Sequence, residues 1–149
     1  MKAVCIIGSP RENGSYIDGK CIQNDDVEQM VLNILTADLV LIVTPSYWGD
    51  VTGQLKTFFD RNTPYGNTNP NRKFQSSGAK GIAISVRAGK TETENQRILD
   101  SIEHYFGHME IEIIAKISVC EVDSLEDLLK KQQEKIDEIY QLGLKISSL

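Results

Sequence analysis

Three short segments of the chain combine small, hydroxyl-bearing and cationic residues, which are the residue types that bind phosphate groups. The first, residues 8–15, reads Gly-Ser-Pro-Arg-Glu-Asn-Gly-Ser. Its small residues let a ligand approach the backbone, its hydroxyls and N–H groups can donate to phosphate oxygens, and Arg11 can form a bidentate contact. Gly, Ser, Pro and Asn also build ordinary turns, so a plain turn is the alternative interpretation of this segment.

The other two segments follow apolar runs further along the chain. Residues 44–49 read Thr-Pro-Ser-Tyr-Trp-Gly and contain the single tryptophan of the chain, and residues 85–89 read Ser-Val-Arg-Ala-Gly. The adjacent rings of Tyr47 and Trp48 can stack on a planar ligand or pack against the domain. The three segments form one candidate site only if the fold brings them together.

Four segments have the patterns of β-strands. Residues 2–7 are nearly all apolar and residues 39–43 wholly so, which is typical of parallel strands covered on both faces, and residues 80–85 are a third predicted strand. Residues 109–119 alternate between apolar and mostly polar side chains, which predicts a strand with one solvated face at a sheet edge.

Helical patterns separate these strands. The first helix follows Asn24, a good N-cap residue, and the second covers residues 51–59. Thr91-x-x-Glu94 resembles a capping box for a third helix that ends at Gly107, and an apolar stripe predicts a long final helix from near residue 124.

Strand and helix therefore alternate four times within 149 residues, a length that supports one domain, residues 1–149. Alternation of this kind predicts an α/β fold with a parallel sheet of about four strands and helices on both faces. Ligands of open parallel sheets bind at the carboxyl ends of the strands, where the three candidate segments fall.

Composition excludes several classes of function. A net charge of −5 argues against nucleic acid as the main partner, because phosphate backbones are bound by clustered Lys and Arg. The longest apolar run, residues 39–43, is too short to span a membrane, and the start of the chain lacks a signal peptide's apolar stretch. We therefore expect a cytoplasmic protein without a membrane partner.

The charge is distributed unevenly along the chain. Residues 61–90 contain six basic residues and no acidic one, although acidic residues outnumber basic ones overall. This segment is either a solvated loop or an electropositive wall for a small phosphorylated ligand.

Cysteine and histidine indicate neither a metal site nor a protein acid or base. The three cysteines, Cys5, Cys21 and Cys120, are scattered and include no CxxC, so we expect reduced thiols. His104 and His108 flank the predicted exit of a helix, where a solvated histidine is the favoured interpretation.

An ordered set of motifs resembles the NADPH-dependent FMN reductase family of flavodoxin-like proteins. The set runs over most of the chain: Gly8-Ser9-Pro10-Arg11-x-Asn13-Gly14-Ser15, Gly19-Lys20-Cys21-x-x-x-Asp25-Asp26, Ala37-Asp38, Thr44-Pro45-Ser46-Tyr47-Trp48-Gly49, Leu55-Lys56, Asp60-Arg61, Lys80-Gly81 and Leu142-Gly143. The resemblance implies a flavodoxin-like three-layer sandwich that binds FMN at the carboxyl edge of its sheet.

The resemblance also implies a role for each candidate residue. Three groups would surround FMN: Ser9, Arg11, Asn13 and Ser15 at the phosphate; Pro45, Ser46, Tyr47, Trp48 and Gly49 along the ribityl chain and one side of the isoalloxazine; Ser85, Arg87 and Gly89 at its other side. The flavin would take hydride from NAD(P)H and pass electrons to a small acceptor, with no catalytic residue strictly required. The basic segment 61–90 would help to hold the pyridine nucleotide phosphates.

One helix-strand unit of the family is missing from this chain. The family has a helix, a strand and a loop between the first loop and the Gly-Lys-Cys motif, where only residues 16–18 intervene here. The deleted region is where iron-sulfur relatives carry closely spaced cysteines, and because a cluster needs about four thiolates, we expect none. The phosphate loop also lacks the helix N-terminus that normally assists it.

The shortened sheet predicts self-association. Residues 2–7 have the composition of a strand buried on both sides, but the deletion would place them at an uncovered edge. We therefore expect a homodimer or larger homo-oligomer. Two functions remain open: an FMN-dependent NAD(P)H oxidoreductase that reduces a flavin, quinone, azo or nitro compound, and a degenerate scaffold with weak or no FMN binding that acts as an interaction module.

Overall fold

The computed structural model describes residue 19 and residues 25–146. The predicted strand at residues 2–7 and the candidate loop at residues 8–15 lie outside this part of the chain. The described elements follow one another in this order: α1 (Val27–Leu35), β1 (Leu39–Pro45), α2 (Gly53–Arg61), the 3-10 turn η1 (Thr63–Tyr65), β2 (Lys80–Val86), α3 (Glu92–His108), β3 (Glu112–Val119), α4 (Leu125–Lys131) and α5 (Gln133–Ile146).

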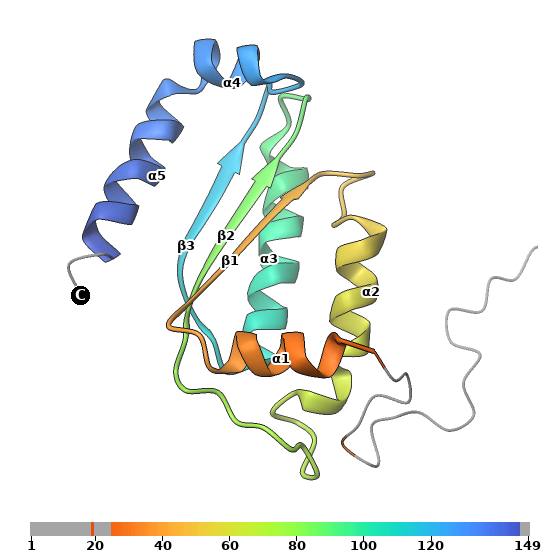
Figure 1. The fold of residues 1–149 in the computed structure, drawn as a ribbon. Helices are drawn as coiled ribbons and strands as arrows, with labels where there is room; N and C mark the ends of the chain where they lie inside the picture. Colours follow the sequence, from red (N-terminus) through yellow and green to blue (C-terminus); the bar gives the residue numbers. More distant parts are fainter. Residues whose placement is uncertain (1–18, 20–24, 147–149) are drawn as a thin grey trace, which may run out of the picture.

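The three described strands form a parallel sheet in the order β1-β2-β3. Helices α2 and α3 cover one face, and α5 lies against the other (Figure 1). The short helix α1 crosses near the amino end of β1. The predicted three-layer α/β architecture is confirmed, and the carboxyl ends of β1 and β2 meet at one edge, as the site requires.

Two apolar clusters hold these layers together. The larger lies on the α2–α3 face, and its fully buried members include Val31, Ile98 and Phe106. The smaller lies under α5 and is built on Ile84 and Ile117. Each cluster buries side chains from several elements, which is the dominant favourable contribution to folding.

The edge strand β3 keeps the predicted alternation of exposure, because Glu112, Ile114 and Lys116 are exposed whereas Ile117 and Val119 are buried. A bulge nevertheless divides its buried residues between the two faces of the sheet. Gly81 of β2 pairs with Ile113, but the next residue, Ile82, pairs with Ala115, so one extra residue lies between them in β3. A bulge of this kind turns the side chains that follow it toward the opposite face of the sheet. Ile113 therefore packs on the α2–α3 side and Ile117 under α5, although their alternation suggests a single face.

Three predicted helix starts or caps differ from the structure, the first at α2, which covers Gly53–Arg61 instead of residues 51–59. The N-cap of α1 is Asp26, whereas Asn24 lies outside the described residues. Thr91 is the N-cap of α3, but its side chain makes no capping hydrogen bond, so the predicted capping box is wrong. The carboxylate of Glu94 binds Arg87 instead, at 2.8 Å.

The predicted ends of the third and fourth helices also need correction. Helix α3 continues through Gly107 to His108, and Glu110 then adopts the left-handed conformation with φ 56°. The N–H of Ile111 donates to the carbonyl of Phe106 at 2.9 Å, which closes a Schellman-type end. The predicted long final helix is two helices, α4 and α5, separated by Gln132.

Strand β1 has one uncovered face within the described part of the chain, where the sequence predicts cover on both. Val40 and Thr44 are buried toward the helices, but Leu39, Leu41 and Val43 are 39%, 54% and 55% exposed on the α5 side. Helix α5 packs over β2 and β3 and does not reach these three side chains. No helix within residues 25–146 has the length and apolar character needed to cross a bilayer.

Candidate functional site

The loops that follow β1 and β2 meet at the carboxyl edge of the sheet. Ser46 donates its backbone N–H to the carbonyl of Val86 at 2.9 Å, which extends the pairing of the two strands by one residue. The N–H of Arg87 donates to the carbonyl of Val119 at 2.9 Å and attaches the end of β3. The structure therefore brings two of the three candidate segments together.

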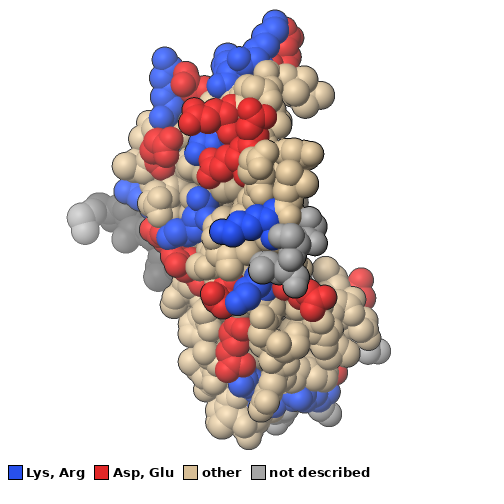
Figure 2. Space-filling view, turned by 90° about the vertical axis from the view of Figure 1, so that its left-hand side faces the viewer, with Lys and Arg blue, Asp and Glu red and all other residues tan. Residues whose placement is uncertain are grey.

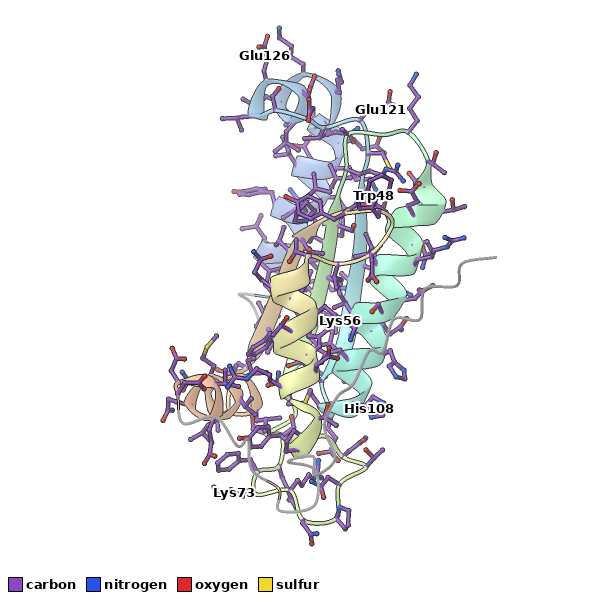
Figure 3. All side chains as sticks on the ribbon, turned by 90° about the vertical axis from the view of Figure 1, so that its right-hand side faces the viewer. Trp48, Lys56, Lys73, His108, Glu121 and Glu126 are labelled. Atoms are coloured by element: carbon purple, nitrogen blue, oxygen red, sulfur yellow. The ribbon has the colours of Figure 1, made fainter. Side chains whose placement is uncertain are left out.

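The first loop holds two aromatic side chains away from the protein. Tyr47 and Asp50 exchange backbone hydrogen bonds of 3.0 and 3.1 Å around a tight turn. Trp48 and Gly49 at its tip have φ values of 58° and 74°, a region that glycine tolerates and tryptophan rarely adopts. Tyr47 is 60% exposed, and Trp48, which lies beyond the end of β1 in Figure 3, is fully exposed.

This turn lies against the beginning of α3. A Cβ atom at Gly49 would stand 3.4 Å from Cγ of Glu94, so the loop and the helix are in contact. The side chain of Asp50 accepts the N–H of Val51 at 2.7 Å and fixes the exit of the loop. Backbone conformation and these contacts, rather than packing of the rings, position Tyr47 and Trp48.

Ser85 lies beneath this edge rather than on its surface. Its side chain is fully buried and donates to Oδ1 of Asn95 at 2.8 Å. Nδ2 of Asn95 in turn donates to the carbonyl of Ser85 and to Oγ of Ser118, at 3.1 and 3.0 Å. The hydroxyl of Ser85 therefore joins the strand ends to α3.

Arg87 folds back over its own loop. Nη1 donates to the carbonyl of Thr91 at 2.7 Å and lies 2.8 Å from the carboxylate of Glu94. Nε is buried and has no hydrogen-bond partner among the described residues. A Cβ atom at Gly89 would come within 2.6 Å of Nη2 of Arg87, so glycine permits this close approach. The arginine therefore keeps one unused donor at the candidate site.

The basic segment does not form an electropositive wall. All six of its cations contact carboxylates that lie outside the segment: Arg61 with Asp25, Arg72 with Glu110, Lys73 with Glu28, Lys80 with Glu112, Arg87 with Glu94 and Lys90 with Glu121. Lys73 and Glu121 lie at opposite ends of the molecule (Figure 3). The face shown in Figure 2 likewise mixes acidic with basic side chains.

The pairing overturns the expectation that residues 61–90 hold nucleotide phosphates as a unit. The positive charge that is continuous in the sequence is spread from one end of the sheet to the other and is locally compensated. Ion pairs lower the pKa values of their carboxyl groups: the Arg61 guanidinium holds the pKa of Asp25 below its ordinary value, and Arg72 does the same for Glu110.

The predicted site residues therefore fall into two sets. Eight of them lie at the carboxyl edge described above: Pro45, Ser46, Tyr47, Trp48, Gly49, Ser85, Arg87 and Gly89. The other four, Ser9, Arg11, Asn13 and Ser15, lie outside the described residues. Sequence reasoning missed Asn95 and Glu94 as supports of the site, because their partners are close only in the folded chain.

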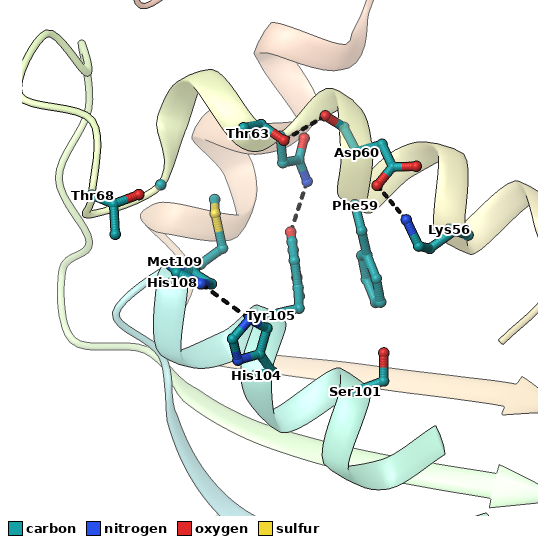
Figure 4. A pocket seen from close by; sticks show the side chains of 12 residues that line it. Lys56, Phe59, Asp60, Thr63, Thr68, Ser101, His104, Tyr105, His108 and Met109 are labelled. Carbon is teal, nitrogen blue, oxygen red and sulfur yellow. Dashed lines mark hydrogen bonds and ion pairs between the residues drawn. The ribbon is translucent and has the colours of Figure 1, made fainter. Parts of the chain in front are cut away.

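A second concave region lies at the opposite edge of the sheet and was not predicted. It is a pocket of about 400 Å³ between the ends of α2 and α3 (Figure 4). Phe59 and Tyr105 stack along it with centroids 4.0 Å apart, and Nδ2 of Asn62 donates to the Tyr105 hydroxyl at 2.7 Å. Burial raises the pKa of Tyr105 well above its ordinary value, and the hydrogen bond from Asn62 offsets part of that rise.

Several curated proteins are similar to part of this chain. An iron-sulfur flavoprotein of Methanocaldococcus jannaschii is 40% identical over 86 residues, which is 58% of this chain and 41% of that protein. An iron-sulfur flavoprotein of Archaeoglobus fulgidus is 36% identical over 74 residues, which is 50% of this chain and 32% of the relative. A Bacillus subtilis protein named as a putative NAD(P)H-dependent FMN-containing oxidoreductase is 29% identical over 87 residues, which is 57% of this chain and 48% of that protein. The chain thus spans less than half of the length of each of these relatives.

Solved structures share the fold. A flavone reductase matches 80% of this chain and 44% of its own length, with a TM-score of 0.62 and 16% identity. The Trp repressor binding protein from Bacillus subtilis matches 72% of this chain and 67% of its own, with a TM-score of 0.58 and 24% identity. The observed sandwich is accordingly flavodoxin-like.

A family model matches the greater part of the chain. The model describes the NADPH-dependent FMN reductases and matches residues 14–119, which include both described loops of the candidate site and leave residues 8–13 outside the match. The order of motifs, the parallel sheet and this match agree, and the chain belongs to the NADPH-dependent FMN reductase family.

Proposed function

We propose that the protein is an FMN-dependent NAD(P)H oxidoreductase whose flavin lies at the carboxyl edge of the sheet. The observation that carries this proposal is the loop after β1, which holds Tyr47 and Trp48 exposed beside the end of β2. Family membership supports an oxidoreductase that uses a flavin. A flavin, a quinone, or an azo or nitro compound is the proposed acceptor class.

The described residues fit a flat ring at this edge. Two exposed aromatic side chains provide stacking surface, and they are fixed by a turn rather than by contacts that a ligand would have to break. On the neighbouring loop, the buried Nε of Arg87 has no hydrogen-bond partner among the described residues, and Gly89 leaves room for the Arg87 guanidinium to lie against the loop. These are the features that a planar, hydrogen-bonding ligand requires.

In the proposed site, the protein binds and orients while the flavin supplies the redox chemistry: it accepts hydride from NAD(P)H and passes electrons to the second substrate. Residues 45–49 would lie along one side of the ring and residues 87–89 along the other. Ser9, Arg11, Asn13 and Ser15 would hold the FMN phosphate. Because Ser85 is turned toward Asn95, its contribution would be to hold the end of β2 in place.

The site has no need of an acid or base from the chain, since hydride and electrons move through the flavin. Its exposed rings leave room for the donor and the acceptor to occupy the same surface in turn, so we expect ping-pong kinetics. We place the reaction in the cytoplasm, in keeping with three scattered cysteines that predict no disulfide framework.

The deciding experiment is a titration with FMN that follows fluorescence from the single tryptophan. Stacking of the flavin on Trp48 should quench this fluorescence and raise the melting temperature, and the complex should oxidise NADPH with a quinone or dye as acceptor. Arg11→Ala should weaken FMN binding, whereas Lys56→Gln, in the pocket at the opposite edge of the sheet, should leave it unchanged. A colourless protein with no FMN-induced thermal shift would instead favour a scaffold that has lost its cofactor and acts as an interaction module.

A further inference from the structure

The two histidines of the chain face each other at the edge of the pocket between α2 and α3. His104 and His108 are one turn apart on α3, and their Nε2 atoms are 3.2 Å apart. The ring planes are 87° apart, and the centroids are only 4.6 Å from each other. If the two rings met head-on at their Nε2 atoms, the ring centroids would lie farther apart than this. The rings therefore approach each other at an angle (Figure 4).

This geometry matches that of two imidazoles on one metal ion. Histidine nitrogen binds zinc at about 2.0–2.1 Å, so two such nitrogens on a tetrahedral ion lie about 3.3–3.4 Å apart. Histidines at positions i and i+4 of one helix face are a recurrent way to place two ligands on one ion. We propose that His104 and His108 form a bidentate site for a divalent transition metal ion, independent of the proposed flavin site.

The surroundings of His108 support a ligand role. Its Nδ1 lies 3.3 Å from Oδ1 of Asn67. A proton on Nδ1 would be donated to this amide oxygen, which leaves the lone pair of Nε2 directed toward His104. Metal-binding histidines almost always use their second nitrogen in this way, because the contact fixes both tautomer and ring orientation.

Asn67 is itself held firmly. Its backbone N–H donates to the carbonyl of His108 at 2.8 Å, and its Nδ2 donates to the carbonyl of Gly107 at 3.1 Å. The same residue therefore caps the end of α3 and orients one of the proposed ligands. The C-terminal end of a helix also carries partial negative charge, which favours a bound cation.

The ligand chemistry selects the class of ion. Imidazole nitrogen suits Zn²⁺, Cu²⁺ and Ni²⁺, whereas Mg²⁺ and Ca²⁺ require oxygen ligands. Within residues 25–146, no group of three His, Cys, Asp or Glu side chains is placed to hold an ion. The remaining positions would therefore be filled by water or by a small ligand in the adjoining pocket of about 400 Å³, and Cu²⁺ should bind most tightly.

The test uses the full chain without an affinity tag, because the sequence contains only two histidines. Electron paramagnetic resonance of the Cu²⁺-loaded protein should show coupling to two imidazole nitrogens. His104→Gln and His108→Gln should each remove one of them. A spectrum without imidazole coupling would overturn the proposal and reduce the pair to a hydrogen bond between two rings.

Calorimetric titration with Zn²⁺ provides a second measurement. One ion per chain is expected, and each single histidine variant should weaken binding by more than the roughly tenfold that loss of a supporting residue costs. Asp60→Asn is the matched control: it lines the same pocket, but its carboxylate is paired with Lys56, so Zn²⁺ affinity should change less than about twofold. Circular dichroism confirms that the variants fold. Unchanged Zn²⁺ affinity in both folded histidine variants, or binding abolished by alkylation of the thiols, would contradict the site.

Discussion

Asn95 determines how the carboxyl edge of the sheet is joined to α3. Its side chain is completely buried, donates to Ser85 and Ser118, and accepts from the hydroxyl of Ser85. A buried amide with every partner satisfied is stabilising, but removal of one partner leaves several polar groups without hydrogen bonds. The loops of the candidate site begin directly beyond these residues.

Asn95→Ala should therefore lower the free energy of unfolding by about 2 to 4 kcal/mol, because carbonyl and hydroxyl groups of both strand ends lose their partner. Urea denaturation followed by circular dichroism measures the change. Thr93→Ala, an exposed position two residues earlier in the same helix, should change it by less than about 0.5 kcal/mol. Equal effects of the two substitutions would show that the buried hydrogen bonds are not important for stability.

At this scale, sequence reasoning identifies local features and misses distant partners. The adjacent rings of Tyr47 and Trp48 after an apolar run are visible as a motif, and the structure places both on an exposed turn. The hydrogen bonds of Asn95 join residues 10 and 23 positions away in the sequence, so no local pattern indicates them. The clustering of basic residues in the sequence is equally misleading about the surface charge, because the carboxylates that pair with Arg61 and Arg72 are 36 and 38 positions away.

At the scale of the elements, the existence of a helix or strand is easier to predict from the sequence than its ends or its buried face. Helices α1, α2 and α3 and strands β1 and β2 follow their apolar patterns. The bulge in β3 depends on how Gly81 and Ile82 pair with the neighbouring strand, which the alternation of β3 alone does not contain. The end of α3 depends on Glu110, although Gly107 is the residue whose type predicts a helix end.

The misleading glycine in α3 offers a stabilising substitution. Gly107 lies inside the helix, and a Cβ atom there would meet no atom within 4 Å. Gly107→Ala should raise the free energy of unfolding by about 0.5–1 kcal/mol, because alanine loses less backbone entropy on folding. The expected readout is a higher melting temperature.

Gly81→Ala is the contrasting variant, since its Cβ atom would stand 2.7 Å from the ring of Phe106. It should destabilise the protein by about 1–3 kcal/mol through overpacking. The explanation from available space fails if both alanine substitutions change stability in the same direction.

The ion pair at the end of α3 should make a small, acid-sensitive contribution. Arg72 holds Glu110 through two hydrogen bonds of 2.9 and 3.0 Å, and this contact keeps the pKa of Glu110 below its ordinary value of 4.5. A carboxyl whose pKa falls on folding stabilises the protein above its unfolded pKa, and this contribution is lost as the pH drops through the folded value.

Glu110→Gln should therefore reduce stability at pH 7 by about 0.5–1 kcal/mol, since the pair is partly exposed, and the difference from the unchanged protein should vanish in strong acid. Urea midpoints measured across the acid range test this. Glu112→Gln removes the more exposed carboxylate that pairs with Lys80. It should leave the urea midpoint almost unchanged both at pH 7 and in strong acid. A difference between Glu110→Gln and the unchanged protein that persists in strong acid would contradict this assignment.

At the scale of the whole molecule, the parallel sheet and its helical layers follow from the alternation of strands and helices in the sequence. Which strand faces are covered does not follow from it. Three side chains of β1, Leu39, Leu41 and Val43, are exposed beside the cluster under α5. An apolar strand surface of this kind favours association. We therefore retain the proposal of a homodimer or larger homo-oligomer, now with these three residues as its contact surface.

Leu41→Lys tests that proposal because the position is 54% exposed, so the substitution should be tolerated by the fold. The unchanged protein should sediment as a dimer or larger species at micromolar concentration, and the variant as a monomer, since a buried and unpaired lysine would penalise the contact. Leu129→Lys provides the control, because Leu129 is 56% exposed on α4 and should leave the assembly intact. If the unchanged protein is a monodisperse monomer, β1 does not mediate self-association; if both lysine variants dissociate equally, the contact surface is not specific to β1.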